Sequence, residues 1–200
     1  MHKYKKHEKK FPEIIEEIAK EWEDERPIRI MFEDEARFGR ITAVHNSWCP
    51  KPYRPVCKVL VSQQYVYAYG VVSIGEGKLE SLVMSGCNTT TMQIFLEEIS
   101  SRHKEEKIIM VMDGAGWHKS KDLVIPSNIK ILHQLPYSPE TNPMEQVWRV
   151  LKLDGFYNRI FENLDELEDH LVEELYIFEH DSSTISSLTS WEWIINALLN

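Results

Sequence analysis

The most constraining feature of this 200-residue chain is an uninterrupted apolar run near its middle. Ile108–Met112 contains no polar residue, and Asp113 and Gly114 follow directly. A strand that is apolar at every position is typical of the centre of a sheet with helices on both faces. The run is far shorter than the roughly 18 residues that a membrane span requires. The sequence therefore predicts a layered α/β fold in which a buried strand ends at an acidic residue.

Hydrophobic periodicity predicts the elements around this strand. The expected strands are 28–33, 65–73 and 78–84, joined as an antiparallel meander, then 107–112 and 128–132. The expected helices are 12–22, 91–103, 143–153, a segment around 164–175 and one around 191–198. The predicted architecture is a mixed sheet, with three antiparallel strands followed by parallel ones, covered by helices. We expect a basic N-terminal segment with a helix over residues 1–27, one domain over 28–180 and a C-terminal helix over 181–200.

Charge and cysteine content narrow the function classes. The net charge is −9, which argues against a protein that coats DNA. Basic residues gather in the first 60 positions, notably at 3–10, 37–40 and 51–58, so any contact with nucleic acid is expected there. Three cysteines cannot all pair, and the sequence favours a reduced, cytoplasmic compartment.

Three carboxylates stand at the ends of predicted elements. Asp34 follows the first strand, Asp113 follows the most buried one, and Glu145 lies in the first turn of the helix that begins at Pro143. If the two strands are neighbours, Asp34 and Asp113 meet at one edge of the sheet. Clustered carboxylates repel one another unless cations neutralise them. Their oxygens favour Mg²⁺ or Mn²⁺, and two such ions support an in-line displacement at phosphorus.

Each acid also has a structural interpretation, which the spacing leaves open. Glu145 stands three residues after Asn142, as in a capping box, and four before Arg149, as in a helical ion pair. Asp34 lies within a short acidic run of the kind that is usually solvated, and Asp113 before Gly114 is a common turn pair.

The sequence around these acids resembles that of IS630-family DDE transposases, which are related to Tc1/mariner elements. The first block is Phe32–Gly39 (FEDEARFG), the second Met112–Ser120 (MDGAGWHKS) and the third Tyr137–Trp148 (YSPETNPMEQVW). Gly86–Thr91 (GCNTTT) resembles the stretch before the central helix of the family. The blocks occur in the family order, and the resemblance extends over roughly residues 28–175.

The resemblance implies an RNase H-like fold and a function in the transposition of a mobile element. It implies that Asp34, Asp113 and Glu145 are catalytic and hold two Mg²⁺ ions, for which Mn²⁺ can substitute. The expected activity is DNA strand cleavage at transposon ends, followed by strand transfer of the 3′-hydroxyl to target DNA. The expected partners are DNA and further copies of the chain in a synaptic complex, at the nucleoid and without membrane contact. Family members usually carry a helix-turn-helix recognition domain, and 27 residues before the first strand are too few for one, so a separate domain is expected to supply it.

Five residues near the acids are candidate DNA contacts, each with a structural alternative. Arg37, Arg40 and Lys119 are expected to contact phosphates because of their nearness to acids that must meet DNA. His118 is equally compatible with the scissile phosphate and with an ordinary loop position. Trp117 could stack on a base, although burial is the commoner fate of tryptophan.

Two further hypotheses compete with a transposase. The chain could be a non-catalytic or truncated remnant that still binds DNA or a partner. It could also be another RNase H-like nuclease, such as a resolvase. A measurement of Mg²⁺ or Mn²⁺ binding distinguishes a transposase from a non-catalytic remnant. A comparison of branched with linear DNA as substrates distinguishes a transposase from a resolvase.

Overall fold

The computed structural model describes residues 2–40, 49–53, 63–134, 141–157 and 159–198. At its centre is a five-stranded sheet with the order β3-β2-β1-β4-β5. The strands are β1 (Ile28–Gly39), β2 (Tyr65–Ser73), β3 (Lys78–Met84), β4 (Lys107–Met112) and β5 (Ile129–His133). β1, β2 and β3 are antiparallel, whereas β4 and β5 run parallel to β1. The predicted mixed sheet is therefore confirmed, with β1 at the junction of its two halves.

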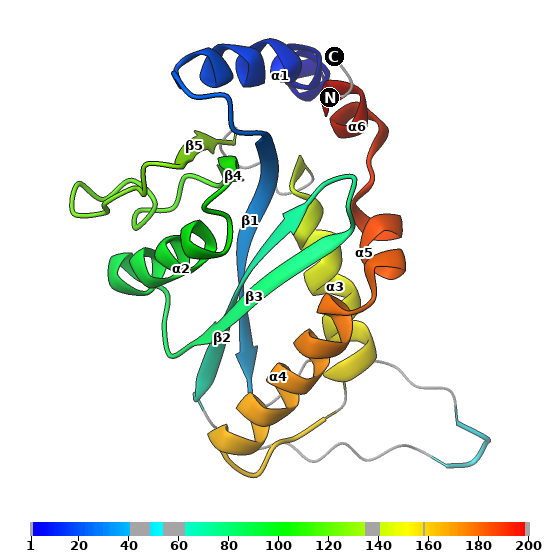
Figure 1. Ribbon diagram of the computed structural model, residues 1–200. Helices are drawn as coiled ribbons and strands as arrows, with labels where there is room; N and C mark the ends of the chain where they lie inside the picture. The colour runs from blue at the N-terminus through cyan, green and yellow to red at the C-terminus, as the bar shows by residue number, and fades with distance from the viewer. Residues whose placement is uncertain (1, 41–48, 54–62, 135–140, 158, 199–200) are drawn as a thin grey trace.

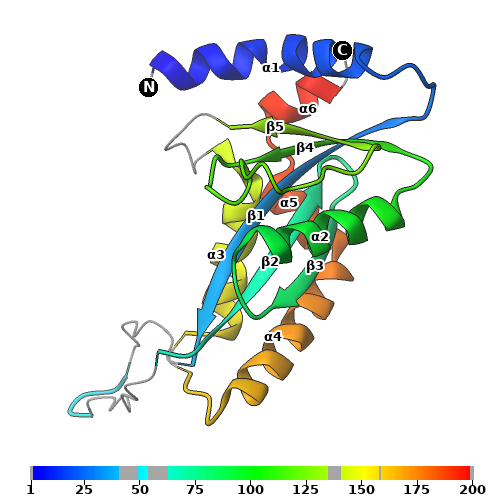
Figure 2. The ribbon, with the colours of Figure 1, turned by 90° about the vertical axis from the view of Figure 1, so that its left-hand side faces the viewer.

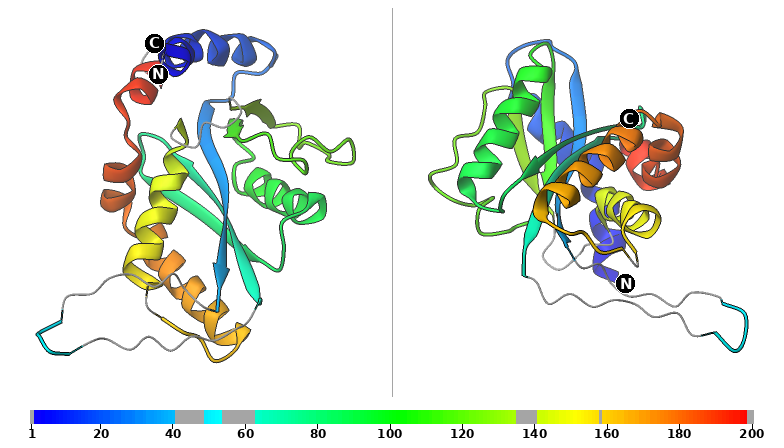
Figure 3. Two further views of the ribbon diagram at one scale, coloured as in Figure 1. Left: turned by 180° about the vertical axis from the view of Figure 1, so that it is seen from behind. Right: turned by 90° about the horizontal axis from the view of Figure 1, so that it is seen from below.

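Helices cover both faces of the sheet (Figure 1). One face carries α2 (Thr89–Arg102), and the other carries α3 (Pro143–Gly155), α4 (Leu164–Glu179) and α5 (Ser182–Thr189). Figure 2 and the view from below in Figure 3 show the sheet between these two layers. No helix within the described ranges is both long and apolar enough to cross a membrane.

The alternation of side chains along β1 explains why the sheet has two cores. Ile30, Phe32 and Phe38 point to the face of α3 and join its apolar residues in one cluster. Met31 points to the opposite face, where it joins the apolar side of α2. β4 contributes to both clusters because all of its residues are buried, as the apolar run predicted.

The first and last helices pack against each other at one end of the sheet. α1 (His2–Lys20) and α6 (Glu192–Leu198) lie together above it (Figure 1). The ring of Phe11 lies 5.2 Å from that of Trp193 and 6.0 Å from that of Phe32, measured between centroids. This aromatic contact attaches both terminal helices to β1.

The three largest differences from the predicted elements are the following. The first helix begins at His2 and not at Pro12, because the preceding residues are rich in Lys, a good helix former even without apolar periodicity. β1 continues to Gly39, so that Asp34 lies within a strand and not at its end. The C-terminal segment holds the short helix α5 before the expected last helix. α5 consists mostly of Ser and Thr, which carry little helical signal.

Candidate active site

The register of the sheet brings the first two predicted acids together. Phe32 of β1 is the partner of Val111 of β4, and this is the last paired position between the two strands. Asp34 and Asp113 each follow two residues later along parallel strands. Asp34 remains paired on its other side with Gly70 of β2. The two acids therefore lie where the pairing of β1 with β4 ends, as predicted. β1 itself continues beyond this point, paired with β2.

The third acid is placed by the start of α3. The side chain of Asn142 accepts a hydrogen bond from the backbone N–H of Met144, at 3.1 Å, and so caps the helix as predicted. The Asn142 amide also donates to the backbone carbonyl of Glu33, at 2.8 Å. This second bond fixes the first turn of α3 beside β1. Glu145 lies in that turn and is exposed.

The structural interpretations of Glu145 are not supported by its contacts. Within the described residues, the cap at Asn142 lacks a reciprocal bond from the Glu145 side chain. Arg149 bonds to Gln146, with 2.9 Å between Nε and Oε1, and forms no ion pair with Glu145 in the described part of the chain. Glu145 therefore remains available for a ligand.

Electrostatics show that the three acids share one region. Burial raises the pKa of Asp34 well above its ordinary value, and the negative charge of Glu145 raises it further. The charges of Glu35 and Asp113 contribute to the same effect. Such mutual repulsion is characteristic of carboxylates gathered without a cation. The oxygen-only set fits Mg²⁺ or Mn²⁺, since hard divalent ions prefer carboxylate ligands.

Asp113 differs from Asp34 because it has a positive partner. Its side chain is 57% exposed, and its Oδ1 lies 2.8 Å from Nδ1 of His118. The same oxygen accepts a hydrogen bond from the backbone N–H of Ala115, also at 2.8 Å. The hydrogen bond from His118 lowers the pKa of Asp113, and that from Ala115 lowers it further. Asp113 is thus held ionised and oriented at the end of β4.

Lys152 was not among the predicted site residues, yet it belongs to this region. Burial lowers the pKa of its amine, while the charges of Glu145 and Asp34 oppose that shift. Its Nζ lies 5.1 Å from the centre of the Phe38 ring. Lys152 stands seven residues after Glu145, which is two helical turns, and this spacing is the signal in the sequence that could have identified it.

The predicted DNA contacts fall into two groups. Arg37 and Lys119 are exposed. The Arg37 guanidinium lies 4.5 Å from the centre of the Tyr65 ring, and the Lys119 amine lies against Gly114, next to Asp113. Both cations are therefore open to solvent, and Lys119 is close to Asp113.

The other three candidates are held within the protein. Arg40 donates to the backbone carbonyls of Phe161 and Glu162. Trp117 donates from its indole nitrogen to Glu35, at 2.7 Å. His118 is buried, with one ring nitrogen facing Asp113 and the other facing Glu35. A role in DNA contact stays a prediction for Arg40, Trp117 and His118, while their observed neighbours give them a role in supporting the loops of the site.

Known proteins resemble this chain in sequence. The family of DDE superfamily endonucleases matches residues 29–168. The uncharacterized protein y4pE/y4sA of Sinorhizobium fredii (strain NBRC 101917 / NGR234) is 36% identical over 107 residues, which are 53% of this chain and 79% of that protein.

Solved structures of the Mos1 mariner transposase share the fold. The paired-end complex with Mg aligns with a TM-score of 0.63 and 15% identity, and the complex with Mn with a TM-score of 0.60 and 14% identity. Each alignment covers 96% of this chain and 61% of the Mos1 chain, so the chain spans less than two thirds of these relatives. The predicted RNase H-like fold is thereby confirmed. Since the family match covers most of the sequence and includes all three acids, this chain belongs to the DDE superfamily endonucleases.

Proposed function

We propose that residues 28–180 form the catalytic domain of an IS630-like transposase that cuts one DNA strand at a transposon end and joins its 3′-hydroxyl to target DNA. The observation that carries this proposal is geometric: Asp34 and Asp113 each lie two residues beyond the paired Phe32 and Val111, and the bond from Asn142 to β1 fixes the turn of Glu145 beside them. These acids come from two strands and a helix that are far apart in sequence. A region that concentrates this much negative charge is suited to bind cations and, through them, a phosphodiester.

The three acids and His118 have different parts in the proposed site. Asp34, Asp113 and Glu145 would hold two Mg²⁺ ions, or Mn²⁺ in their place. Bound there, the ions supply charge neutralisation at phosphorus and activation of water or of the 3′-hydroxyl. His118 keeps Asp113 ionised and fixed in direction, since their nitrogen and oxygen lie 2.8 Å apart.

The cations near the proposed site suit the approach of a DNA backbone. Arg37 and Lys119 would contact phosphates flanking the scissile bond, and Lys152 would meet the strand beside Glu145. The net charge of −9 makes the rest of the surface a poor DNA ligand. Recognition of the transposon ends would therefore come from a separate helix-turn-helix domain, and self-association in a synaptic complex would bring two ends together at the nucleoid.

Nicking of supercoiled plasmid DNA in Mg²⁺ or Mn²⁺ tests the proposal. We expect Asp34→Asn, Asp113→Asn and Glu145→Gln each to reduce nicking to background, while circular dichroism and thermal melting show an intact fold. Asp122→Asn is the matched control, because Asp122 is an exposed acid in the loop after Asp113 and makes no side-chain contact with the three acids among the described residues. Nicking retained by any of the three variants would remove that residue from the catalytic set.

Calorimetric titration separates the proposal from a non-catalytic remnant. We expect the unaltered protein to bind Mg²⁺ and Glu145→Gln to bind it more weakly. An absence of Mg²⁺ binding at millimolar concentration would instead favour a DNA- or partner-binding remnant. Linear and branched DNA substrates separate a transposase from a resolvase. Cleavage of linear DNA as readily as branched DNA would favour a transposase, whereas preferential cleavage of branched DNA would favour a resolvase.

A further inference from the structure

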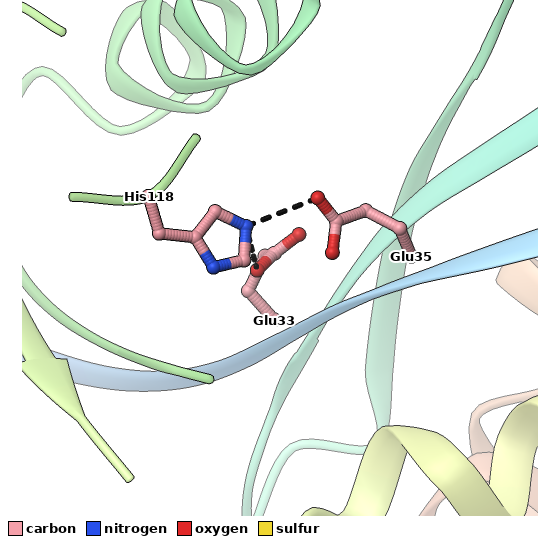
Figure 4. A group of neighbouring side chains, drawn as sticks. All are labelled: Glu33, Glu35 and His118. Atoms are coloured by element: carbon pink, nitrogen blue, oxygen red, sulfur yellow. Dashed lines mark hydrogen bonds and ion pairs between the residues drawn. The ribbon is translucent and has the colours of Figure 1, made fainter. Parts of the chain in front are cut away.

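Two acids of β1 face away from Asp34 and meet a histidine (Figure 4). Glu33 and Glu35 are two residues apart, and the alternation of a strand places both on the face of α2. The Nε2 atom of His118 lies 3.0 Å from Oε1 of Glu35 and 3.8 Å from Oε2 of Glu33. We call Glu33, Glu35 and His118 the inner cluster. One ligand atom from each of its members lies within 4.8 Å of the others.

Glu33 is the unusual member of the inner cluster. It has no solvent exposure, and neither of its carboxylate oxygens has a hydrogen-bond partner within the described residues. Burial raises the pKa of Glu33 well above its ordinary value, and the charge of Glu35 adds to this. An unpartnered carboxylate in the interior is costly, and the nearest positive group to Glu33 is the His118 ring, 3.8 Å away and beyond hydrogen-bond distance. Figure 4 shows its carboxylate directed toward the histidine ring.

The other members of the inner cluster are held in place from behind. His118 faces the pocket with Nε2, while its Nδ1 lies 2.8 Å from Oδ1 of Asp113. Metal-binding histidines typically donate their second nitrogen to a carboxylate in this way. The indole N–H of Trp117 donates to Oε1 of Glu35, at 2.7 Å. These contacts fix the direction of the ring and of the carboxylate.

A second buried histidine shows that the inner cluster is not an ordinary ion-pair network. His103 lies between Glu80, at 2.7 Å, and Glu106, at 2.6 Å. That group is neutralised by side chains of the protein itself: Lys78, Arg102 and Arg29 pair with the two acids. In the part of the chain that the structure describes, no lysine or arginine pairs with either acid of the inner cluster.

We propose that the inner cluster is a binding site for one divalent transition-metal ion, distinct from the site of Asp34, Asp113 and Glu145. One imidazole nitrogen with two carboxylate oxygens suits Zn²⁺, Mn²⁺ or Fe²⁺ better than Mg²⁺. Two ligands at about 2.1 Å from one ion lie at most about 4.2 Å apart, and both distances from Nε2 of His118 meet this limit. The ion would take the place of the proton on Nε2 of His118 and give Glu33 the direct positive partner that the ring, at 3.8 Å, does not provide.

The inner cluster would act as a structural brace for the proposed catalytic site. Its ligands come from β1 and from the loop that follows β4, which are the segments that carry Asp34 and Asp113. An ion bound between them would fix the spacing of those segments. Asp113 links the two sites, since its carboxylate contacts His118 directly.

Mn²⁺ binding to the untagged full-length chain tests this site without reference to activity. The double variant Asp34→Asn/Glu145→Gln removes the proposed catalytic pair, whose ligands are all oxygens. In that variant we expect one Mn²⁺ to remain bound and to show ¹⁴N coupling by electron spin-echo spectroscopy, because of the two proposed sites only the inner cluster contains a nitrogen ligand. We expect Zn²⁺ to displace this ion and millimolar Mg²⁺ to leave it in place. Since the variant is expected not to nick DNA, this result is independent of the proposed transposase activity.

Substitutions in the same background assign the ligands. Glu33→Gln and Glu35→Gln should each weaken Mn²⁺ binding at least tenfold, and His118→Gln should also abolish the ¹⁴N coupling. His133→Gln is the matched control, since Nδ1 of His133 lies 3.0 Å from the backbone carbonyl of Asp113 and outside the inner cluster. If His118→Gln does not fold, the two glutamate variants decide the question.

Two outcomes would overturn the proposal. Absence of ¹⁴N coupling in the double variant would mean that His118, as an imidazolium, is the only cation of the inner cluster. The ion would belong to other ligands if Glu33→Gln and Glu35→Gln both kept full Mn²⁺ affinity and the ¹⁴N coupling. The same conclusion would follow if His133→Gln lost the ¹⁴N coupling.

Discussion

The substitution Gly70→Ala would separate the acids of the proposed catalytic site without altering any of them. Gly70 of β2 is the partner of Asp34 and faces α3. A Cβ atom at this position would lie 2.6 Å from the terminal methyl of Met144 and 2.6 to 2.7 Å from the ring of Trp148. The absence of a side chain at Gly70 therefore lets α3 approach the sheet at the turn that carries Glu145.

The size of the effect follows from these contacts. Ordinary contacts to a Cβ begin at 3.4 Å, so the neighbours must withdraw by about 0.8 Å. The Met144 methyl can rotate away, but Trp148 is only 2% exposed and cannot move without α3. Overpacking of this kind costs about 1–3 kcal/mol of stability. A displacement of about 1 Å in a catalytic group can lower the rate on the order of 100-fold.

Plasmid nicking and calorimetric melting would measure both effects. We expect Gly70→Ala to nick about 10- to 100-fold more slowly and to melt on the order of 5 °C lower, while remaining folded. Gly116→Ala is the control, because a Cβ there has no neighbour within 4 Å. A Gly70→Ala protein that nicks and melts like Gly116→Ala would refute the view that this glycine sets the distance between α3 and β1.

Three further predictions concern other parts of the structure. In the presence of a chelator, Glu33→Gln should stabilise the fold by about 1–3 kcal/mol at pH 7–8 and by little near pH 4, measured by urea unfolding. The reason is that Glu33 has a raised pKa in the folded state, so the protein loses stability as pH rises above the ordinary value of 4.5. Asn142→Ala should cost about 1–2 kcal/mol in the same assay, because it removes the cap of α3 and the bond to β1. Arg37→Ala and Lys119→Ala should each reduce the salt dependence of DNA binding by about one unit of slope, whereas Arg40→Ala should mainly lower the melting temperature.

Much of the fold could be predicted because its signals are local. The apolar run at Ile108–Met112 matches β4 closely, since a strand covered on both faces tolerates no polar residue. Asn142 followed by Pro143 marks the start of α3, because cap chemistry depends on neighbouring residues. By contrast, β1 was expected to end near Glu33. Its acidic continuation is held by pairing with β2, which no local pattern reveals.

The candidate site was predictable in its members but not in its arrangement. Asp34, Asp113 and Glu145 could be selected from their positions along the chain. The close approach of α3 depends on Gly70, which stands in an unremarkable strand sequence. Arg40 shows the opposite case: its nearness to the acids suggested DNA, but long-range folding brings carbonyls of the segment before α4 to its guanidinium.

The two-sided character of β1 has a consequence for how this sequence can change. Consecutive acids serve opposite faces, so point substitutions can alter one face and spare the other. Insertion or deletion of a single residue upstream of Glu33 within the strand would invert every position that follows it. Two carboxylates would then enter the layer beneath α3, and a lone aspartate would turn toward the imidazole. This segment should therefore tolerate exchange of residues while its length stays fixed.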